Sequence, residues 1–220
     1  MTTEFIYIAD PMCSWCYGFT KELQEFLQDF EAPRLEIVLG GLRPYQRQAS
    51  DAEMCQMILQ HWQKVQDVSG LPFTQPGLLT PGFVYDTEPV CRAMVLTQTI
   101  CDDLSASQQL QVFSALQRAF YADSRDVTQL PVLAEILTEV LNSADFDYQF
   151  TQAELLEGLL SAATQEQTRA HFQQVQQWGV RGFPVLLLVQ PKGLLMLGNG
   201  YAKVQELRAS YAELSQNQAG

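Results

Sequence analysis

The stretch Cys13-Ser14-Trp15-Cys16, taken with the residues on either side of it, is the strongest indication of the fold of this chain. The run before it, Phe5-Ile6-Tyr7-Ile8, is typical of a strand, and an amphipathic helical pattern follows it. Two cysteines at this spacing between a strand and a helix indicate a redox-active dithiol rather than half of a metal site. Free N–H groups and the macrodipole at a helix N-terminus stabilise a thiolate, which favours Cys13 as the nucleophile. We expect Cys16, about one turn further on, to be more buried and to resolve a mixed disulfide at Cys13.

Structural roles for this pair are the weaker alternatives. A zinc site needs four donors, and the other cysteines and the histidines form no second closely spaced pair: Cys55, Cys91, Cys101, His61 and His171. A structural disulfide between Cys13 and Cys16 would close a very small loop and constrain little. We therefore expect no metal here, and we expect the three remaining cysteines to pack as small apolar groups.

Composition limits the class of protein. The chain has 220 residues, of which 47% are hydrophobic and 17% charged, as in a globular protein. Its formal net charge of −12 disfavours nucleic acid and anionic membranes as partners. The N-terminal residues lack a signal-peptide pattern, and no apolar run approaches the length of a membrane span. If this sequence is the whole chain, we expect a cytoplasmic protein.

The order of patterns along the chain indicates an α/β protein. Strand-like runs at residues 5–8 and 35–39 flank a helical pattern, which predicts a parallel pair with a right-handed crossover. Helical patterns fill residues 50–178, and the apolar run at 185–189 is typical of a central strand covered on both faces. A second strand and a final helix follow. We therefore predict βαβ, a helical block and ββα, with domains at 1–48 plus 179–220 and at 49–178, and with a helix at about 164–178 packing on the first domain.

Capping signals predict where several helices begin. Thr87 is placed to cap a helix with Pro89 in its first turn. A capping-box spacing, in which a hydroxyl residue precedes Glu or Gln by three positions, occurs four times: Ser50 with Glu53, Ser105 with Gln108, Thr151 with Glu154, and Thr164 with Gln167.

Gly182-Phe183-Pro184 stands directly before the predicted central strand. Proline cannot donate to a sheet ladder, so the simple interpretation is a proline at the first position of a strand. The alternative is a cis-proline loop that faces the two cysteines. A cis bond costs little at an X–Pro position, and such a loop leaves the backbone of Phe183 free to pair with an extended substrate.

With both motifs, the whole chain resembles the DsbA-like family of thioredoxin-fold proteins, nearest to its FrnE-type branch. The residues that carry the resemblance are Asp10-Pro11-Met12-Cys13-Ser14-Trp15-Cys16-Tyr17-Gly18 and Gly179-Val180-Arg181-Gly182-Phe183-Pro184, with weaker matches at residues 85–89 and 121–126. The resemblance implies a thioredoxin-like fold with a large inserted helical domain. It also implies that Cys13 is the nucleophile, Cys16 the resolving thiol and Pro184 the cis-proline. Ser14-Trp15 between the cysteines and Phe183 before the proline depart from the better-known patterns.

The function implied is thiol–disulfide oxidoreductase or isomerase activity on protein or peptide substrates. The resemblance implies no cofactor beyond the redox-active disulfide, with glutathione as a candidate co-substrate. The alternative is a glutathione-dependent transferase or isomerase, because kappa-class glutathione transferases and 2-hydroxychromene-2-carboxylate isomerases share this architecture. Those relatives usually carry a single serine-type active residue. Both Cys13 and Cys16 are present here, which favours dithiol chemistry.

Further residues complete the expected site. Asp10 is a candidate modulator of the thiols or a proton relay, although capping of the following helix is favoured. Trp15 offers apolar surface to a substrate or packs in the core. We expect the substrate groove to lie between the surface of Cys13, Trp15 and Phe183-Pro184 and the helical block, with the Pro- and Gly-rich loop at 73–85 overhanging it.

Overall fold

The computed structural model describes residues 2–75 and 78–216, in which a four-stranded mixed sheet forms the centre. In chain order the strands are β1 (Glu4–Ala9), β2 (Arg34–Leu39), β3 (Val185–Gln190) and β4 (Gly193–Asn199). Their order across the sheet is β2-β1-β3-β4, with β1 parallel to β2 and antiparallel to β3. The expected parallel pair and the interior position of the 185–189 run are therefore confirmed.

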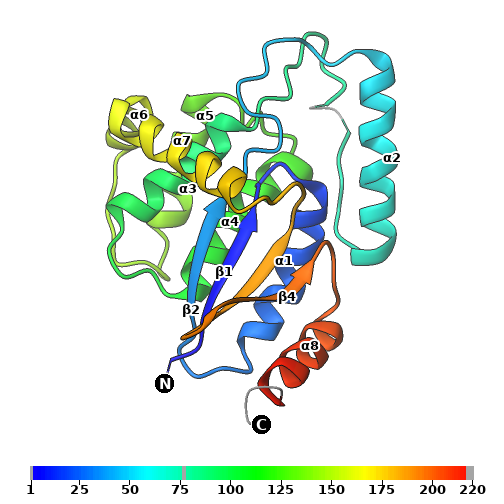
Figure 1. Ribbon diagram of the computed structural model, residues 1–220. Helices are drawn as coiled ribbons and strands as arrows, with labels where there is room; N and C mark the ends of the chain where they lie inside the picture. Colours follow the sequence, from blue (N-terminus) through cyan, green and yellow to red (C-terminus); the bar gives the residue numbers. More distant parts are fainter. Residues whose placement is uncertain (1, 76–77, 217–220) are drawn as a thin grey trace.

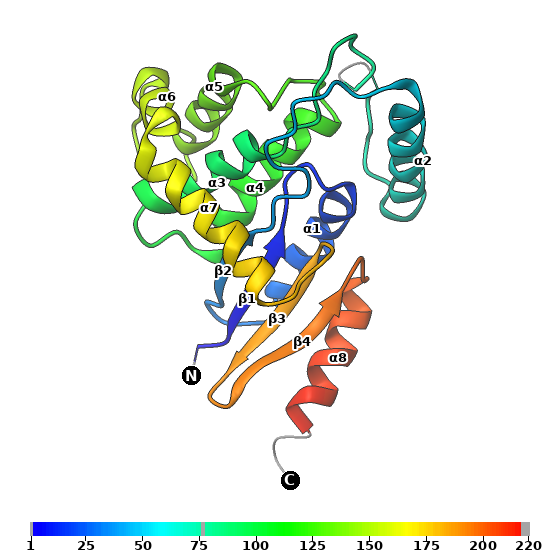
Figure 2. The ribbon, with the colours of Figure 1, turned by 45° about the horizontal axis from the view of Figure 1, so that its top comes forward.

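Both faces of the two central strands, β1 and β3, are apolar and covered (Figures 1 and 2). On one face, Tyr7 of β1 and Leu186 of β3 belong to the main core together with α1 (Ser14–Leu27) and α8 (Val204–Gln216). On the other face, Ile6 and Leu187 pack against Val175 of α7 (Ala162–Gln177). Alternate side chains of one strand thus enter different cores, which explains why the strands show continuous apolar runs.

The remaining helices lie between β2 and β3 in the chain. They are α2 (Ala52–Ser69), α3 (Glu88–Ile100), α4 (Ala106–Tyr121), α5 (Leu130–Leu141) and α6 (Gln152–Leu160). In Figure 2, α3 to α6 gather on one side of the sheet and α2 stands apart near α1. Buried side chains of α3, α4 and α5 belong to the same hydrophobic core as β1 and α1. The helical block is therefore joined to the sheet by a continuous core, while the predicted boundaries at 48/49 and 178/179 stay a prediction.

The helix starts differ in part from the capping signals. Ser105 and Thr151 form complete capping boxes, as predicted. The prediction was wrong for Ser50, because Asp51 caps α2 by accepting from Met54 N. It was also wrong for Thr164, which lies inside α7 and donates its backbone N–H to the cap Ser161. Thr87 does occupy the N-cap position of α3, but its hydroxyl accepts from Arg43 N rather than capping the helix.

One end of the sheet brings distant segments together. Ile8 of β1 pairs with Val185 of β3, so the residues after β1 lie beside those before β3. Gly40, which follows β2, donates to Ala9 O. An ideal Cβ on Gly40 would lie 2.0 Å from Phe183 Cζ, so only glycine leaves room for this ring. The turn containing the two cysteines and the Phe183-Pro184 loop therefore meet at this end.

Candidate active site

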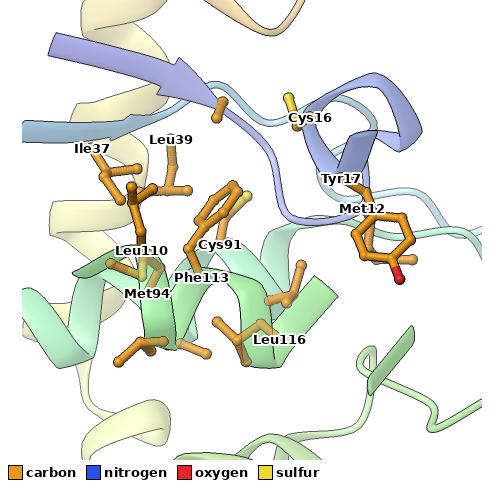
Figure 3. Packing of buried hydrophobic residues seen from close by; sticks show 14 of the residues in the cluster. Met12, Cys16, Tyr17, Ile37, Leu39, Cys91, Met94, Leu110, Phe113 and Leu116 are labelled. Carbon is orange, nitrogen blue, oxygen red and sulfur yellow. The ribbon is translucent and has the colours of Figure 1, made fainter. Parts of the chain in front are cut away.

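The first helix places Cys13 and Cys16 at one end of the sheet. Cys13 is the N-cap residue of α1, and Cys16 lies in the first turn of that helix. The exposed fraction is 6% for Cys13 and 0% for Cys16, so Cys16 is the more buried, as expected. Both cysteines are free thiols in the structure. Figure 3 shows Cys16 near Met12 and Tyr17 at the start of α1, above the core side chains of α3 and α4.

The Phe183-Pro184 loop lies directly against Cys13. The peptide bond between Phe183 and Pro184 is cis. The Cys13 thiol donates to the Phe183 carbonyl oxygen across 3.8 Å, and Gly200 N donates to Pro184 O across 2.7 Å. Within residues 2–75 and 78–216, no hydrogen-bond partner is recorded for the backbone N–H of Phe183. The loop therefore presents an unused backbone donor close to the Cys13 sulfur.

Asp10 is a buried carboxylate at the base of the same turn. Its Oδ1 accepts from Met12 N across 2.8 Å, and its Oδ2 accepts from Leu42 N across 2.6 Å. The thiol of Cys91 on α3 also donates to Oδ2, across 3.5 Å. The expected capping role was wrong, because Cys13 is the N-cap of α1 and the Asp10 carboxylate instead ties the loop after β2 to the cysteine turn.

Burial controls the protonation of these groups. It raises the pKa of Asp10, while hydrogen bonds from Leu42, Thr87, Met12 and Cys91 oppose the rise. Burial also raises the pKa of Cys16 well above the usual thiol value, with a further contribution from the neighbouring Cys13 thiol. A main-chain hydrogen bond from Asp10 partly offsets that rise. The Cys16 sulfur therefore keeps its proton at neutral pH until a base accepts it.

Two tyrosine hydroxyls meet at the carbonyl of Met12, next to Cys13. Tyr85 Oη donates to Met12 O across 2.6 Å, and Tyr121 Oη donates to the same atom across 2.5 Å. Tyr85 precedes α3 and Tyr121 ends α4, so both come from the helical block. In the sequence, Tyr85 ends the loop expected to overhang the groove, whereas Tyr121 stands out only in a segment that carries the family resemblance. No pattern in the sequence indicated that they meet at one atom.

The remaining predicted residues occupy the rim of the site. Trp15 is half-buried, with its ring centroid 6.0 Å from that of Tyr201. In the loop predicted to overhang the groove, Phe73 packs its ring against Tyr17, whereas residues 76 and 77 lie outside the described residues. A hollow of about 860 Å³ lies at the other end of the sheet beside Arg34 and Ser105. It is therefore separate from the thiols.

A family model described as a DSBA-like thioredoxin domain matches residues 6–212, which is nearly the whole chain. The chain belongs to this family. A crystal structure described as that of a putative protein disulfide isomerase from Nitrosomonas europaea is 32% identical with a TM-score of 0.84, and 99% of each chain is covered. The expected DsbA-like thioredoxin fold with a helical insertion is thereby confirmed.

Other solved structures share the fold of this DSBA-like protein at lower identity. The cytosolic disulfide reductase DsbM from Pseudomonas aeruginosa is 21% identical with a TM-score of 0.72, covering 99% of this chain and 100% of that one. A 2-hydroxychromene-2-carboxylate isomerase is 13% identical with a TM-score of 0.64, covering 98% of each chain. Comparison with curated protein sequences gave no match.

Among the residues that the structure describes, no group of three or more His, Cys, Asp and Glu side chains is placed to hold a metal ion. In the same part of the chain, no helix combines the length and apolarity needed to cross a bilayer.

Proposed function

We propose that this DSBA-like protein is a cytoplasmic thiol–disulfide oxidoreductase that acts on protein or peptide disulfides through Cys13 and Cys16. The observation that carries the proposal is the placement of Cys13 at the N-cap of α1 beside the Phe183-Pro184 loop, with Cys16 buried one turn away. The N-terminal N–H groups of a helix favour the attacking thiolate. A buried second thiol is protected until the mixed disulfide has formed.

The reaction proceeds in two exchanges. The Cys13 thiolate attacks one sulfur of the substrate disulfide, so a Cys13–substrate S–S bond forms and the other substrate sulfur leaves as a thiol after taking a proton. Cys16 loses its proton and attacks the Cys13 sulfur, which releases the second substrate thiol. The substrate has then gained two electrons, and Cys13 and Cys16 form a disulfide. Thiols such as glutathione return the pair to the reduced state, and DsbM has been crystallised with GSH.

We place the substrate in an extended conformation across the Phe183-Pro184 loop, between the cysteine turn and the helical block. The unused N–H of Phe183 can donate to a substrate carbonyl, and among the described residues its C=O is engaged only by the weak thiol donor of Cys13. The half-buried ring of Trp15 supplies apolar contact at the rim. The Phe183 ring packs toward Gly40, so Phe183 offers its backbone rather than its ring to a substrate.

Asp10 is the candidate proton acceptor for Cys16. Burial is the main cause of the raised pKa of Cys16, and the negative charge of Asp10 raises this pKa further. A thiol with a raised pKa attacks slowly unless a base takes its proton. Asp10 is a carboxylate buried at the same turn, and its own pKa is raised, which brings it closer to the pKa of a thiol.

For Asp10→Asn we expect resolution of a Cys13 mixed disulfide to slow at least about tenfold, since general-base catalysis contributes about 100-fold or more. Asp10 is ionised above its raised pKa and protonated below it, so the wild-type rate should fall as the pH drops through that value. The variant should lack this part of the pH profile. Stopped-flow release of a fluorescent peptide thiol from a preformed mixed disulfide measures the rate. An unchanged profile in a folded variant would remove Asp10 from the mechanism.

The proposed function is tested by equilibrating the wild-type protein with buffers of increasing GSSG-to-GSH ratio. Thiols are then trapped with a maleimide and located by mass spectrometry. We expect Cys13 and Cys16 to convert together to a disulfide in a two-electron titration, whose midpoint gives the reduction potential and hence the working direction. We also expect turnover of a peptide disulfide. The proposal fails if no Cys13–Cys16 disulfide forms, or if a Cys16→Ala variant fully retains turnover of a glutathione-conjugation substrate.

A further inference from the structure

We propose that Tyr85 and Tyr121 are positioning residues that hold the Met12–Cys13 peptide and thereby set the reactivity of the Cys13 thiol. This inference rests on the proposed function for its biological meaning. Both hydroxyls donate to one oxygen, Met12 O, across 2.6 Å and 2.5 Å. A carbonyl oxygen has two lone pairs, and this pair of donors occupies both.

The hydrogen bonds from the two tyrosines to Met12 O are buried, and this restricts movement of the Met12 peptide. Met12 and Tyr121 are fully buried, and Tyr85 is nearly so. Water cannot replace the two donors in such a position without a rearrangement, and an unsatisfied buried carbonyl is costly. The Met12 peptide is therefore held on its carbonyl side by the two tyrosines. On its amide side, Cys13 N donates to Asp10 O across 3.0 Å.

Fixing this peptide fixes the direction of the Cys13 side chain. The peptide plane together with the Cys13 φ of −86° determines where the Cys13 Cα–Cβ bond points, and hence limits how the sulfur lies against the helix N-terminus and the Phe183 carbonyl, 3.8 Å away. The two rings are themselves held by packing. Tyr121 stacks on Tyr17 with ring centroids 4.8 Å apart, and the ring centroid of Tyr85 lies 5.6 Å from that of Phe120.

Both hydroxyls stay protonated, so both remain hydrogen-bond donors. Burial raises the pKa of both tyrosines, and negative charge at Cys13 raises both further. Both therefore remain protonated donors whose positive O–H ends face the Met12–Cys13 peptide. Because both tyrosines come from the helical block, that block contributes to the chemistry at Cys13 as well as to the walls of the proposed groove.

The test compares Tyr85→Phe, Tyr121→Phe and the double variant in a Cys16→Ser background. The rate of iodoacetamide alkylation at Cys13 is followed against pH by mass spectrometry. For the double variant we expect the midpoint of the profile to rise by about one pH unit, which lowers the rate below the midpoint about tenfold. Each single variant should show an intermediate shift. Replacement by Phe keeps the ring packing and removes only the hydroxyl.

Tyr17→Phe is the matched control, because its hydroxyl donates to Pro72 O at 3.3 Å in the same aromatic cluster and does not reach Met12. We expect its profile to match that of the parent. An unchanged midpoint in the folded double variant overturns the inference, as does an equal shift in Tyr17→Phe. If the double variant does not fold, unchanged profiles in both single variants overturn it. The alkylation rate can be measured in a protein that turns over no disulfide. Failure of the proposed function and failure of this inference would therefore appear in different experiments.

Discussion

Cys13→Ser is expected to reduce the rate of disulfide exchange by at least about 100-fold, because loss of a covalent nucleophile removes nearly all of the catalysed rate. A serine hydroxyl stays protonated where a thiol ionises, so it cannot attack a disulfide. Reduction of a fluorescent peptide disulfide by glutathione, with and without the variant, measures the effect. Cys55→Ser is the matched control, since Cys55 lies on α2 and its thiol contacts Leu78 O rather than the cysteine turn.

Cys16→Ser should have a different outcome. The first exchange needs only Cys13, so the variant should accumulate a mixed disulfide with its substrate that Cys16 can no longer resolve. Non-reducing electrophoresis and mass spectrometry should locate the substrate at Cys13. Full turnover by Cys13→Ser would contradict the assignment of the nucleophile. Full turnover by Cys16→Ser without a trapped intermediate would favour monothiol chemistry of the glutathione-transferase type.

The parts of this site that the sequence predicted are those coded by local patterns. A strand, a CxxC and a helix are adjacent in the chain, so the N-terminal position of Cys13 and the deeper burial of Cys16 follow from helix geometry alone. The run 185–189 is apolar on both faces because it lies inside the sheet. Pro184 stands directly before that run, and this position brings it to the end of β1.

The parts that the sequence did not predict depend on contacts between distant segments. The hydroxyls of Tyr85 and Tyr121 reach Met12 across separations of 73 and 109 residues. Asp10 precedes a helix as a capping residue often does, yet it bonds to Leu42 in the loop after β2. Thr87 has the N-cap position, but its hydroxyl accepts from Arg43 instead. For Asp10 and Thr87, a tertiary partner replaced the capping role that the local pattern indicated.

Gly40 lies where three segments meet, and its substitution is expected to lower both stability and turnover. Gly40→Ala would place a Cβ 2.0 Å from Phe183 Cζ, so the Phe183 ring or its loop must move. Overpacking of this kind typically costs about 1–3 kcal/mol of unfolding free energy. The activity should fall further than stability alone explains, by about tenfold or more, because misplacement of a binding group by about 1 Å can cost 100-fold. Chemical denaturation and peptide-disulfide turnover measure the two effects.

Gly182→Ala is the matched control for this substitution. Gly182 lies in the same loop, directly before Phe183, and an added Cβ there would meet no atom within 4 Å. We expect Gly182→Ala to retain both stability and turnover. If Gly40→Ala also retained full turnover, the Phe183 loop would not need its observed position beside Cys13. If Gly182→Ala lost as much activity as Gly40→Ala, the cause would be altered flexibility of the loop, since no steric contact explains it. Loss in Gly40→Ala alone would tie disulfide exchange to the packing of Phe183 against Gly40.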